Sequence, residues 1–255
     1  MNNTLTSLIM LIASACSGPA WAKAEPEPIK DDNRQLAVVV TDSWTDIQGE
    51  MTLFERGDDN QWHAIGEPGA VVIGRTGLAW GIGLHELQQG QQKVEGDGKA
   101  PAGVFRLGNA FGYMDALTTG LDYHPMDAGD YCIDVNGSPY YNQLVNTKVV
   151  GEKAVEGSSE AMRRDIHSQD DLYKKGIIVA HNPENISGAG SCIFMHLWRA
   201  ADKPTAGCTA MAEADMDALL RWLDKDKQPL MVILPRMEYA LKQTLWRLPP
   251  LGPQK

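Results

Sequence analysis

The sequence predicts a mostly β domain, a sandwich or barrel of short mixed strands with a few peripheral helices. Apolar β-like runs are short and closely spaced, glycine-rich turns separate them, and strands do not alternate regularly with long helices. The turns fall at residues 66–69, 96–103 and 187–190. Strands are expected at Leu36–Thr41, Met51–Arg56, Ala70–Gly74, Val104–Leu107, Tyr131–Val135, Gly176–His181, Cys192–Trp198 and Leu230–Leu234.

A few segments carry the periodicity of a helix. The strongest is Ala212–Leu223, where apolar residues recur at helical spacing and Glu213 and Asp215 stand in the first turn. A short helix is expected at Ser158–Arg164, and an amphipathic helix at residues 237–248 ends before two prolines.

The first 22 residues are expected to be a secretory signal peptide, because they contain no charged side chain and include a short apolar core. Ala20-Trp21-Ala22 fits the cleavage site of such a signal. The apolar run is too short to span a membrane, so the mature protein is expected to have no transmembrane segment. The alternative is a lipoprotein anchored through Cys16, although Ala13 stands where such signals usually have Leu. The expected location is the periplasm.

The rest of the chain divides into three parts. Residues 23–35 are polar and interrupted by prolines, as in a flexible leader, residues 36–236 form one domain, and residues 237–255 form a helical tail. The net charge of −10 argues against a nucleic-acid partner, because no basic patch is present to neutralise phosphates.

The expected export indicates how the cysteines are paired. Without Cys16, an odd number of cysteines remains: Cys132, Cys192 and Cys208. In an oxidising compartment the simplest arrangement pairs Cys132 with Cys192 and leaves Cys208 as a free thiol. The alternative is that all three are reduced and buried.

The residues best suited to catalysis are His196, on a strand-like run, and Cys208, twelve residues later. Cys208 follows the small-residue turn Thr205-Ala206-Gly207, just ahead of the predicted helix. A helix end and a nearby imidazolium favour a thiolate, and backbone N–H groups at Gly207 and Cys208 can face an oxyanion. The alternative reading is structural, because a lone buried histidine or cysteine is usually part of a core.

Alternation along the strand places His196 on one face and apolar residues on the other. One face carries Ile193, Met195 and Leu197; the opposite face carries Cys192, Phe194, His196 and Trp198. His181, His196 and Cys208 could also form a three-ligand metal site, but no metal-binding spacing supports it. His181 is alternatively a residue that contacts substrate from a neighbouring strand.

The glycine-rich segment Glu95–Gly103 is not a nucleotide-binding loop. It lacks the order of glycines, lysine and hydroxyl residue that cradles phosphates, and no long helix follows it. We interpret it as a structural loop or as part of a substrate groove.

Two motifs in order resemble the L,D-transpeptidase catalytic domain, the YkuD family. The first is His196 followed by Pro204-Thr-Ala-Gly-Cys-Thr-Ala-Met211, and the second is Lys99-Ala-Pro-Ala-Gly-Val-Phe-Arg106. The resemblance covers roughly residues 36 to 236 and is closest to a divergent branch of the family. It implies a YkuD-like β fold, a Cys208 nucleophile, a His196 base oriented by a backbone carbonyl, and no cofactor. The implied substrates are peptidoglycan stem peptides; the residues expected to contact them are Thr205, His181, Arg199 and Trp198.

The sequence departs from the family pattern at two positions near the cysteine. Leu197 stands where the family has Gly, and Ala210 stands where it has Arg. Arg199 and Arg106 are the candidates to replace that Arg. A hydrolase (carboxypeptidase or amidase) on the same scaffold and a non-catalytic wall-binding module remain the alternatives to a transpeptidase.

Overall fold

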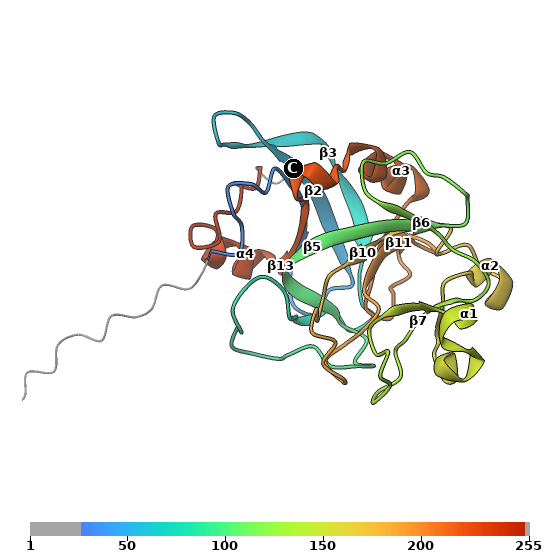
Figure 1. Cartoon of the computed structure of the whole chain (residues 1–255). Helices are drawn as coiled ribbons and strands as arrows, with labels where there is room; N and C mark the ends of the chain where they lie inside the picture. The colour runs from blue at the N-terminus through green and yellow to red at the C-terminus, as the bar shows by residue number, and fades with distance from the viewer. Residues whose placement is uncertain (1–26, 253–255) are drawn as a thin grey trace, which may run out of the picture.

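The computed structural model describes residues 27–252 of the chain, so the expected signal peptide and Cys16 lie outside the described residues. Within them the protein is mostly β, as predicted, with short helices at the periphery (Figure 1). The strands are β1 (Gln35–Thr41), β2 (Gln48–Arg56), β3 (Trp62–Val72), β4 (Leu78–Trp80), β5 (Ala100–Gly112), β6 (Tyr123–Pro125), β7 (Asp130–Cys132), β8 (Leu144–Asn146), β9 (Glu160–Ala161), β10 (Lys175–Val179), β11 (Phe194–Leu197), β12 (Thr209–Met211) and β13 (Leu230–Pro235).

Helices are short throughout this region. They are α1 (Thr147–Val150), α2 (Arg164–His167), α3 (Glu213–Trp222) and α4 (Arg236–Lys242), with 3₁₀ turns at Glu152–Val155 and Lys225–Lys227. No helix between residues 27 and 252 has the length and apolar character needed to cross a membrane.

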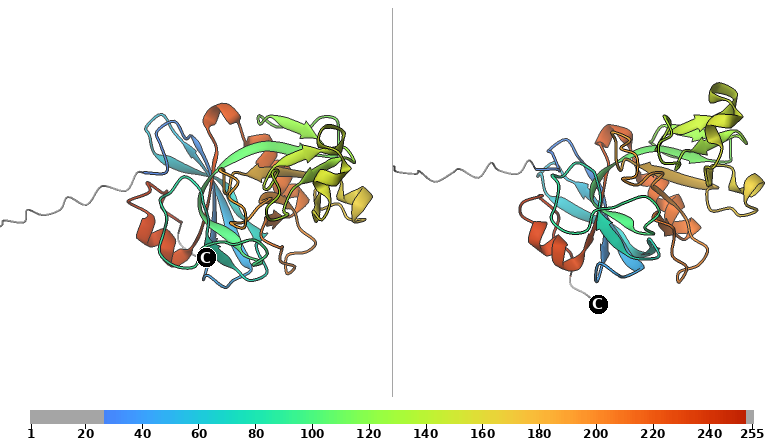
Figure 2. Two further views of the ribbon diagram at one scale, coloured as in Figure 1. Left: turned by 60° about the horizontal axis from the view of Figure 1, so that its bottom comes forward. Right: turned by 90° about the horizontal axis from the view of Figure 1, so that it is seen from below.

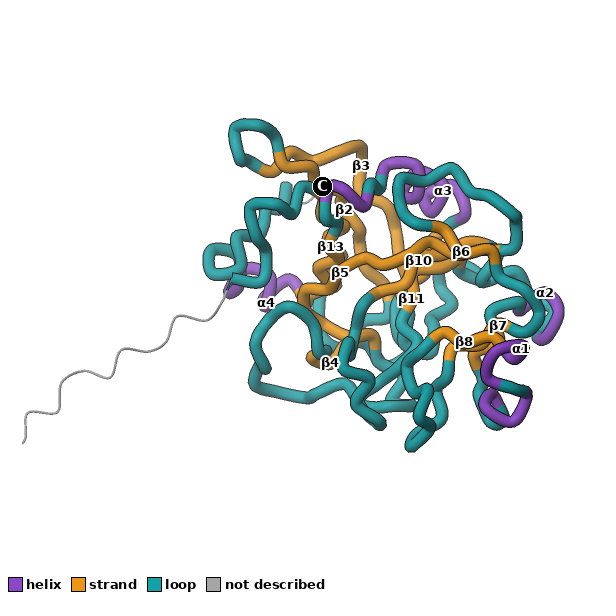
Figure 3. Tube along the Cα trace, viewed as in Figure 1, coloured by secondary structure: helices purple, strands orange, loops and turns teal. Residues whose placement is uncertain are grey.

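The main sheet curls until its ends meet, which makes it a barrel (Figure 3). Its strands follow the order β10-β11-β12-β3-β2-β1-β13-β5-β4, and β10 also pairs with β5 and closes the ring. The pairs β1–β13 and β11–β12 are parallel, whereas the other pairs around the ring are antiparallel. Closure pairs the backbone of every ring strand on both sides, so the ring has no open edge.

Strand β11 separates two apolar clusters, as the alternation in the sequence predicted. Ile193, Met195 and Leu197 pack into the main core inside the barrel. Phe194 packs into a second, smaller cluster, which also contains Cys192 and Cys208. His196 is on the same face of β11 as Phe194, because side chains two positions apart share a face.

A small sheet, β8-β7-β9, lies beside the barrel, on the side away from α4 (Figure 2). It is joined to the barrel by a disulfide between Cys132 in β7 and Cys192 just before β11, which leaves Cys208 as a free, buried thiol. This is the arrangement predicted from the odd number of cysteines in a protein expected to be exported.

Most predicted strands are present, and several are longer than expected. β3 runs through the turn predicted at residues 66–69, and β5 begins at Ala100, inside the loop predicted at residues 96–103. The strands that the sequence did not indicate are β4, β6, β8, β9 and β12, none of which exceeds 3 residues. Strands of that length are too short to display alternation and depend on their neighbours for pairing.

The helix predicted at Ser158–Arg164 is wrong. β9 forms there instead, with Glu160 and Ala161 pairing to β7, and the single-turn helix α2 starts only at Arg164. Pairing with β7 satisfies backbone groups that a helix would otherwise satisfy. The helix predicted at Ala212–Leu223 is confirmed as α3, whereas the predicted C-terminal helix is shorter and ends at Lys242.

The predicted boundaries of the domain are too narrow. Ile29, in the expected flexible leader, is fully buried in the main core, and the Asn33 amide Nδ2 donates to the Gln228 carbonyl over 3.0 Å. At the other end, Tyr239 and Trp246 are each 1% exposed and belong to the same core. Both flanking segments therefore contribute apolar residues to the main core.

Candidate active site

The parallel pairing of β11 with β12 places Cys208 beside β11, the strand that carries His196. The register opposes Met195 to Thr209 and His196 to Ala210. The backbone N–H of Phe194 donates to the Cys208 sulfur over 3.3 Å, and the thiol donates to the Cys192 carbonyl over 3.5 Å. The thiol is thus held by backbone groups of Cys192 and Phe194, at the start of β11.

Cys208 and His196 line one cavity of about 160 Å³. Its walls come from four parts of the chain: β9, α2, the segment leading into β10, and the stretch from β11 to β12. The residues that line it are Glu160, Arg164, Leu172, Tyr173, His196, Leu197, Trp198, Arg199, Lys203, Pro204, Thr205, Ala206 and Cys208. A cavity lined by apolar side chains together with a few charged groups is the kind of site that binds a polar peptide end.

The two reactive side chains are neutral in the unliganded protein. Burial raises the pKa of the Cys208 thiol to about 12, and the nearby Glu160 carboxylate adds to the increase. Burial also lowers the pKa of the His196 imidazole to about 4. The expectation that a helix end would stabilise a thiolate is wrong, because β12 stands between Cys208 and α3.

The tautomer of His196 follows from its hydrogen bond. Nδ1 lies 2.8 Å from the backbone carbonyl of Leu197, so Nδ1 carries the proton and donates it there. Nε2 is left with its lone pair, as a general base requires. The ring packs against Tyr173, with centroids 5.1 Å apart. A backbone carbonyl therefore orients the imidazole.

Thr205 shapes the turn that carries the thiol. Its hydroxyl accepts from the Gly207 N–H over 3.1 Å and donates to the Cys208 carbonyl over 2.7 Å. The Gly207 N–H is therefore engaged, whereas the Cys208 N–H makes no hydrogen bond within residues 27–252. The oxyanion donor that the turn leaves free is Cys208 N–H.

Gly207 is required by a close approach of backbone. A Cβ at this position would lie 3.0 Å from the Lys99 carbonyl. Lys99 belongs to the upstream segment Lys99–Arg106, so the two motifs of the sequence meet at this turn. Steric room for the Lys99 backbone explains a glycine immediately before the cysteine.

The sequence profile of the YkuD family, described as the L,D-transpeptidase catalytic domain, matches residues 42–233, well over half of the chain. The chain belongs to this family. No curated protein and no solved structure matches it at a significant level. Among the described residues of this L,D-transpeptidase domain, no group of three or more His, Cys, Asp or Glu is placed to hold a metal ion.

Two residues named from the sequence are elsewhere in the domain. His181 is 2% exposed and lines a different cavity beside the disulfide. Its Nδ1 accepts from the Ile82 N–H over 3.2 Å, and its Nε2 lies 3.0 Å from the Ala189 carbonyl. Both nitrogens are used by the backbone, and His181 does not line the cavity that contains Cys208 and His196.

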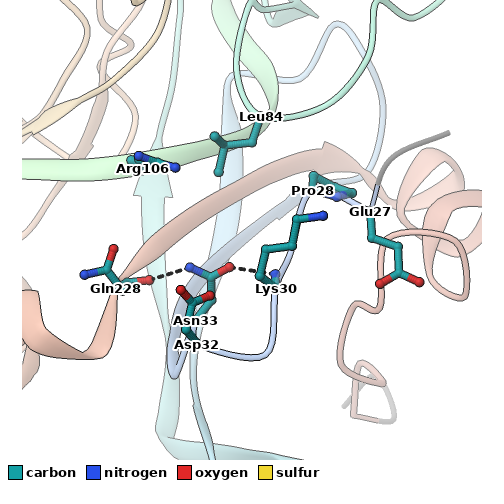
Figure 4. A pocket seen from close by; sticks show the side chains of 8 residues that line it. All are labelled: Glu27, Pro28, Lys30, Asp32, Asn33, Leu84, Arg106 and Gln228. Atoms are coloured by element: carbon teal, nitrogen blue, oxygen red, sulfur yellow. Dashed lines mark hydrogen bonds between the residues drawn. The ribbon is translucent and has the colours of Figure 1, made fainter.

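Arg106 does not replace the family arginine either. It lines a different cavity, of about 180 Å³, together with residues such as Glu27, Lys30 and Gln228 (Figure 4). The cations at the Cys208 cavity are Arg164, Arg199 and Lys203. Trp198 and Arg199 do lie at this cavity, as expected, and the side chain of Arg199 is 56% exposed.

Several residues of the cavity are not indicated by the sequence, among them Glu160, Arg164 and Tyr173. The Arg164 guanidinium makes two hydrogen bonds to the Asp170 carboxylate, over 2.7 and 2.8 Å, and lies 5.2 Å above the Tyr173 ring. None of these residues belongs to the two family-like motifs. Their role is visible only once β9 and α2 are placed against β11.

Proposed function

We propose that this protein is an exported cysteine L,D-transpeptidase that acts on peptidoglycan stem peptides through a thioester on Cys208. One observation carries the proposal: Cys208 and the His196 imidazole line one cavity, and the Cys208 N–H makes no hydrogen bond within residues 27–252. Membership of the L,D-transpeptidase family supports the reaction class. The implied substrate bond is the one between the L-centre of diaminopimelate and a terminal D-Ala.

Because the thiol and the imidazole are both neutral at rest, attack is coupled to proton transfer. His196 Nε2 takes the thiol proton while the sulfur adds to the peptide carbonyl carbon. Negative charge develops on the carbonyl oxygen, where the Cys208 N–H can donate to it. The C–N bond then breaks, the departing amine receives the proton from His196, and a thioester remains.

The second half of the reaction reverses the first. An amine of an acceptor peptide gives its proton to His196, attacks the thioester carbonyl and displaces the Cys208 sulfur, which regains the proton. If water takes the place of the amine, the product is a shortened stem, and the enzyme is a carboxypeptidase or amidase.

Export is supported by two features. The uncharged, apolar N-terminal segment fits a signal peptide. The Cys132–Cys192 disulfide fits a compartment in which thiols are oxidised, such as the periplasm.

The test is to incubate tetrapeptide stems with the purified protein and to identify the products by mass spectrometry. Wild type is expected to release D-Ala and to form either cross-links or shortened stems. Cys208→Ala is expected to abolish turnover, and His196→Gln to lower it by roughly two to four orders of magnitude, the range of general base catalysis. The matched control is His124→Gln, at an exposed histidine. Full turnover by Cys208→Ala would contradict a Cys208 nucleophile, and absence of turnover by wild type would indicate a binding module.

A further inference from the structure

Glu160 is the carboxylate of the Cys208 cavity that has no cationic partner. The Tyr173 hydroxyl donates to its Oε2 over 2.5 Å, and Oε1 makes no hydrogen bond within the described part of the chain. The neighbouring cations are engaged elsewhere: Arg164 and Arg199 both bind the Asp170 carboxylate.

The position of Glu160 is fixed by the fold. It pairs with Cys132 across β7 and β9, and Cys132 is joined by the disulfide to Cys192. The Cys192 carbonyl in turn accepts from the Cys208 thiol. Strand pairing, the disulfide and this hydrogen bond thus connect Glu160 to Cys208 and fix the position of Glu160 in the cavity.

A negative charge at this position opposes the chemistry of the free enzyme. Glu160 adds to the effect of burial in raising the pKa of Cys208, whereas Lys93 and Arg164 lower it. Burial likewise raises the pKa of the Glu160 carboxyl; the Tyr173 hydrogen bond and Arg164 lower it, and Asp134 and Glu95 raise it. A carboxylate beside the nucleophile therefore disfavours formation of the thiolate, unless the bound substrate supplies a cation.

We propose that Glu160 is a specificity-determining residue that binds an ammonium group of the substrate, carried on the residue that acylates Cys208. The proposal rests on the proposed function and deepens it. The ammonium group forms an ion pair with the Glu160 carboxylate and thereby removes the repulsion between this carboxylate and the developing thiolate. Arg199 and Lys203 also line the cavity and are largely exposed, so each can bind a substrate carboxylate in place of its present partner, Asp170 or Asp202. The pattern of charge thus matches a peptide residue that carries both an ammonium and a carboxylate.

The test compares two tetrapeptide stems that differ at one group: the side-chain amine of the third residue is free or acetylated. Wild type is expected to prefer the free amine by roughly tenfold or more in kcat/KM, because the acetylated peptide leaves the carboxylate unpaired. Glu160→Gln is expected to lose this preference. Glu156→Gln, at an exposed glutamate nearby, should keep it. Equal preference in wild type and Glu160→Gln would overturn the proposal.

A second measurement is independent of turnover. Iodoacetamide should alkylate Cys208 faster in Glu160→Gln than in wild type at neutral pH, because the opposing charge is gone. The free-amine stem should alter the alkylation rate of wild type more than the acetylated stem does, whereas the two stems should act alike on the variant. If wild type cleaves neither stem, the proposed function fails, and this measurement decides the inference: rates unaffected by the amine and by the substitution overturn it.

Folding of the variants is checked by near-UV circular dichroism. If Glu160→Gln does not fold, Glu160→Asp replaces it. Aspartate keeps the charge but is shorter by one methylene, so a reduced preference for the free amine supports the proposal. An unchanged preference for the free amine in Glu160→Asp, or equal cleavage of the two stems by wild type, overturns it.

Discussion

Removal of the Cys132–Cys192 disulfide should lower the free energy of unfolding substantially. The bond closes a loop between residues 60 positions apart, which restricts the unfolded chain by an entropy worth about 4 kcal/mol at room temperature. For a domain of this size, that loss corresponds to a fall in Tm of roughly 8–16 °C. The expected variant is Cys132→Ala combined with Cys192→Ala.

The assay is urea unfolding of the oxidised wild type and the double variant, followed by tryptophan fluorescence. The control is a reductant, which should destabilise wild type toward the level of the variant and leave the variant unchanged. A difference below about 1 kcal/mol would refute the reasoning, because the disulfide would then not restrain the unfolded chain.

The same double variant reports on the site. Cys192 has a left-handed backbone, φ +54°, and its N–H donates to the Asn142 side chain over 2.9 Å. The disulfide helps to hold this conformation, which aims the Cys192 carbonyl at the Cys208 thiol. A changed alkylation rate of Cys208 in the folded variant is therefore expected; an unchanged rate would show that Asn142 and β11 suffice.

The remaining predictions concern the core and acid stability. Trp246→Ala is expected to lower the free energy of unfolding by about 3–5 kcal/mol, since this side chain is 1% exposed, whereas Leu245→Ala, at a residue 42% exposed, should cost far less in the same urea titration. Burial lowers the pKa of His85, His181 and His196 to about 4. The unfolded chain then binds more protons between about pH 6.5 and 4, so stability is retained above this window and falls within it as pH decreases, by up to about 1.4 kcal/mol per pH unit for each histidine. His181→Gln should reduce that slope by one histidine's share in urea titrations at several pH values; an unchanged slope would contradict a neutral, buried His181.

Local patterns predicted much of the fold. The apolar run at Leu36–Thr41, the alternation through Cys192–Trp198 and the helical spacing of Ala212–Leu223 each correspond to an element of the structure. These elements are long enough for the burial of one face to produce a recognisable pattern of apolar residues in the sequence. Short elements leave no such pattern, which is why the sequence around β9 predicts a helix and that of β12 predicts no strand.

The sequence by itself determined the mostly β class, the family and the candidate pair His196 and Cys208, because each of these is recorded in residues close together along the chain. Only the tertiary structure decided what surrounds that pair. Burial makes both groups neutral, β12 moves the thiol away from the end of α3, and Thr205 occupies the Gly207 amide. Glu160 reaches the cavity through the pairing of β9 with β7, and His181 is turned away from it. Ionisation and substrate contacts depend on groups that are distant in sequence, and chain folding alone brings those groups together.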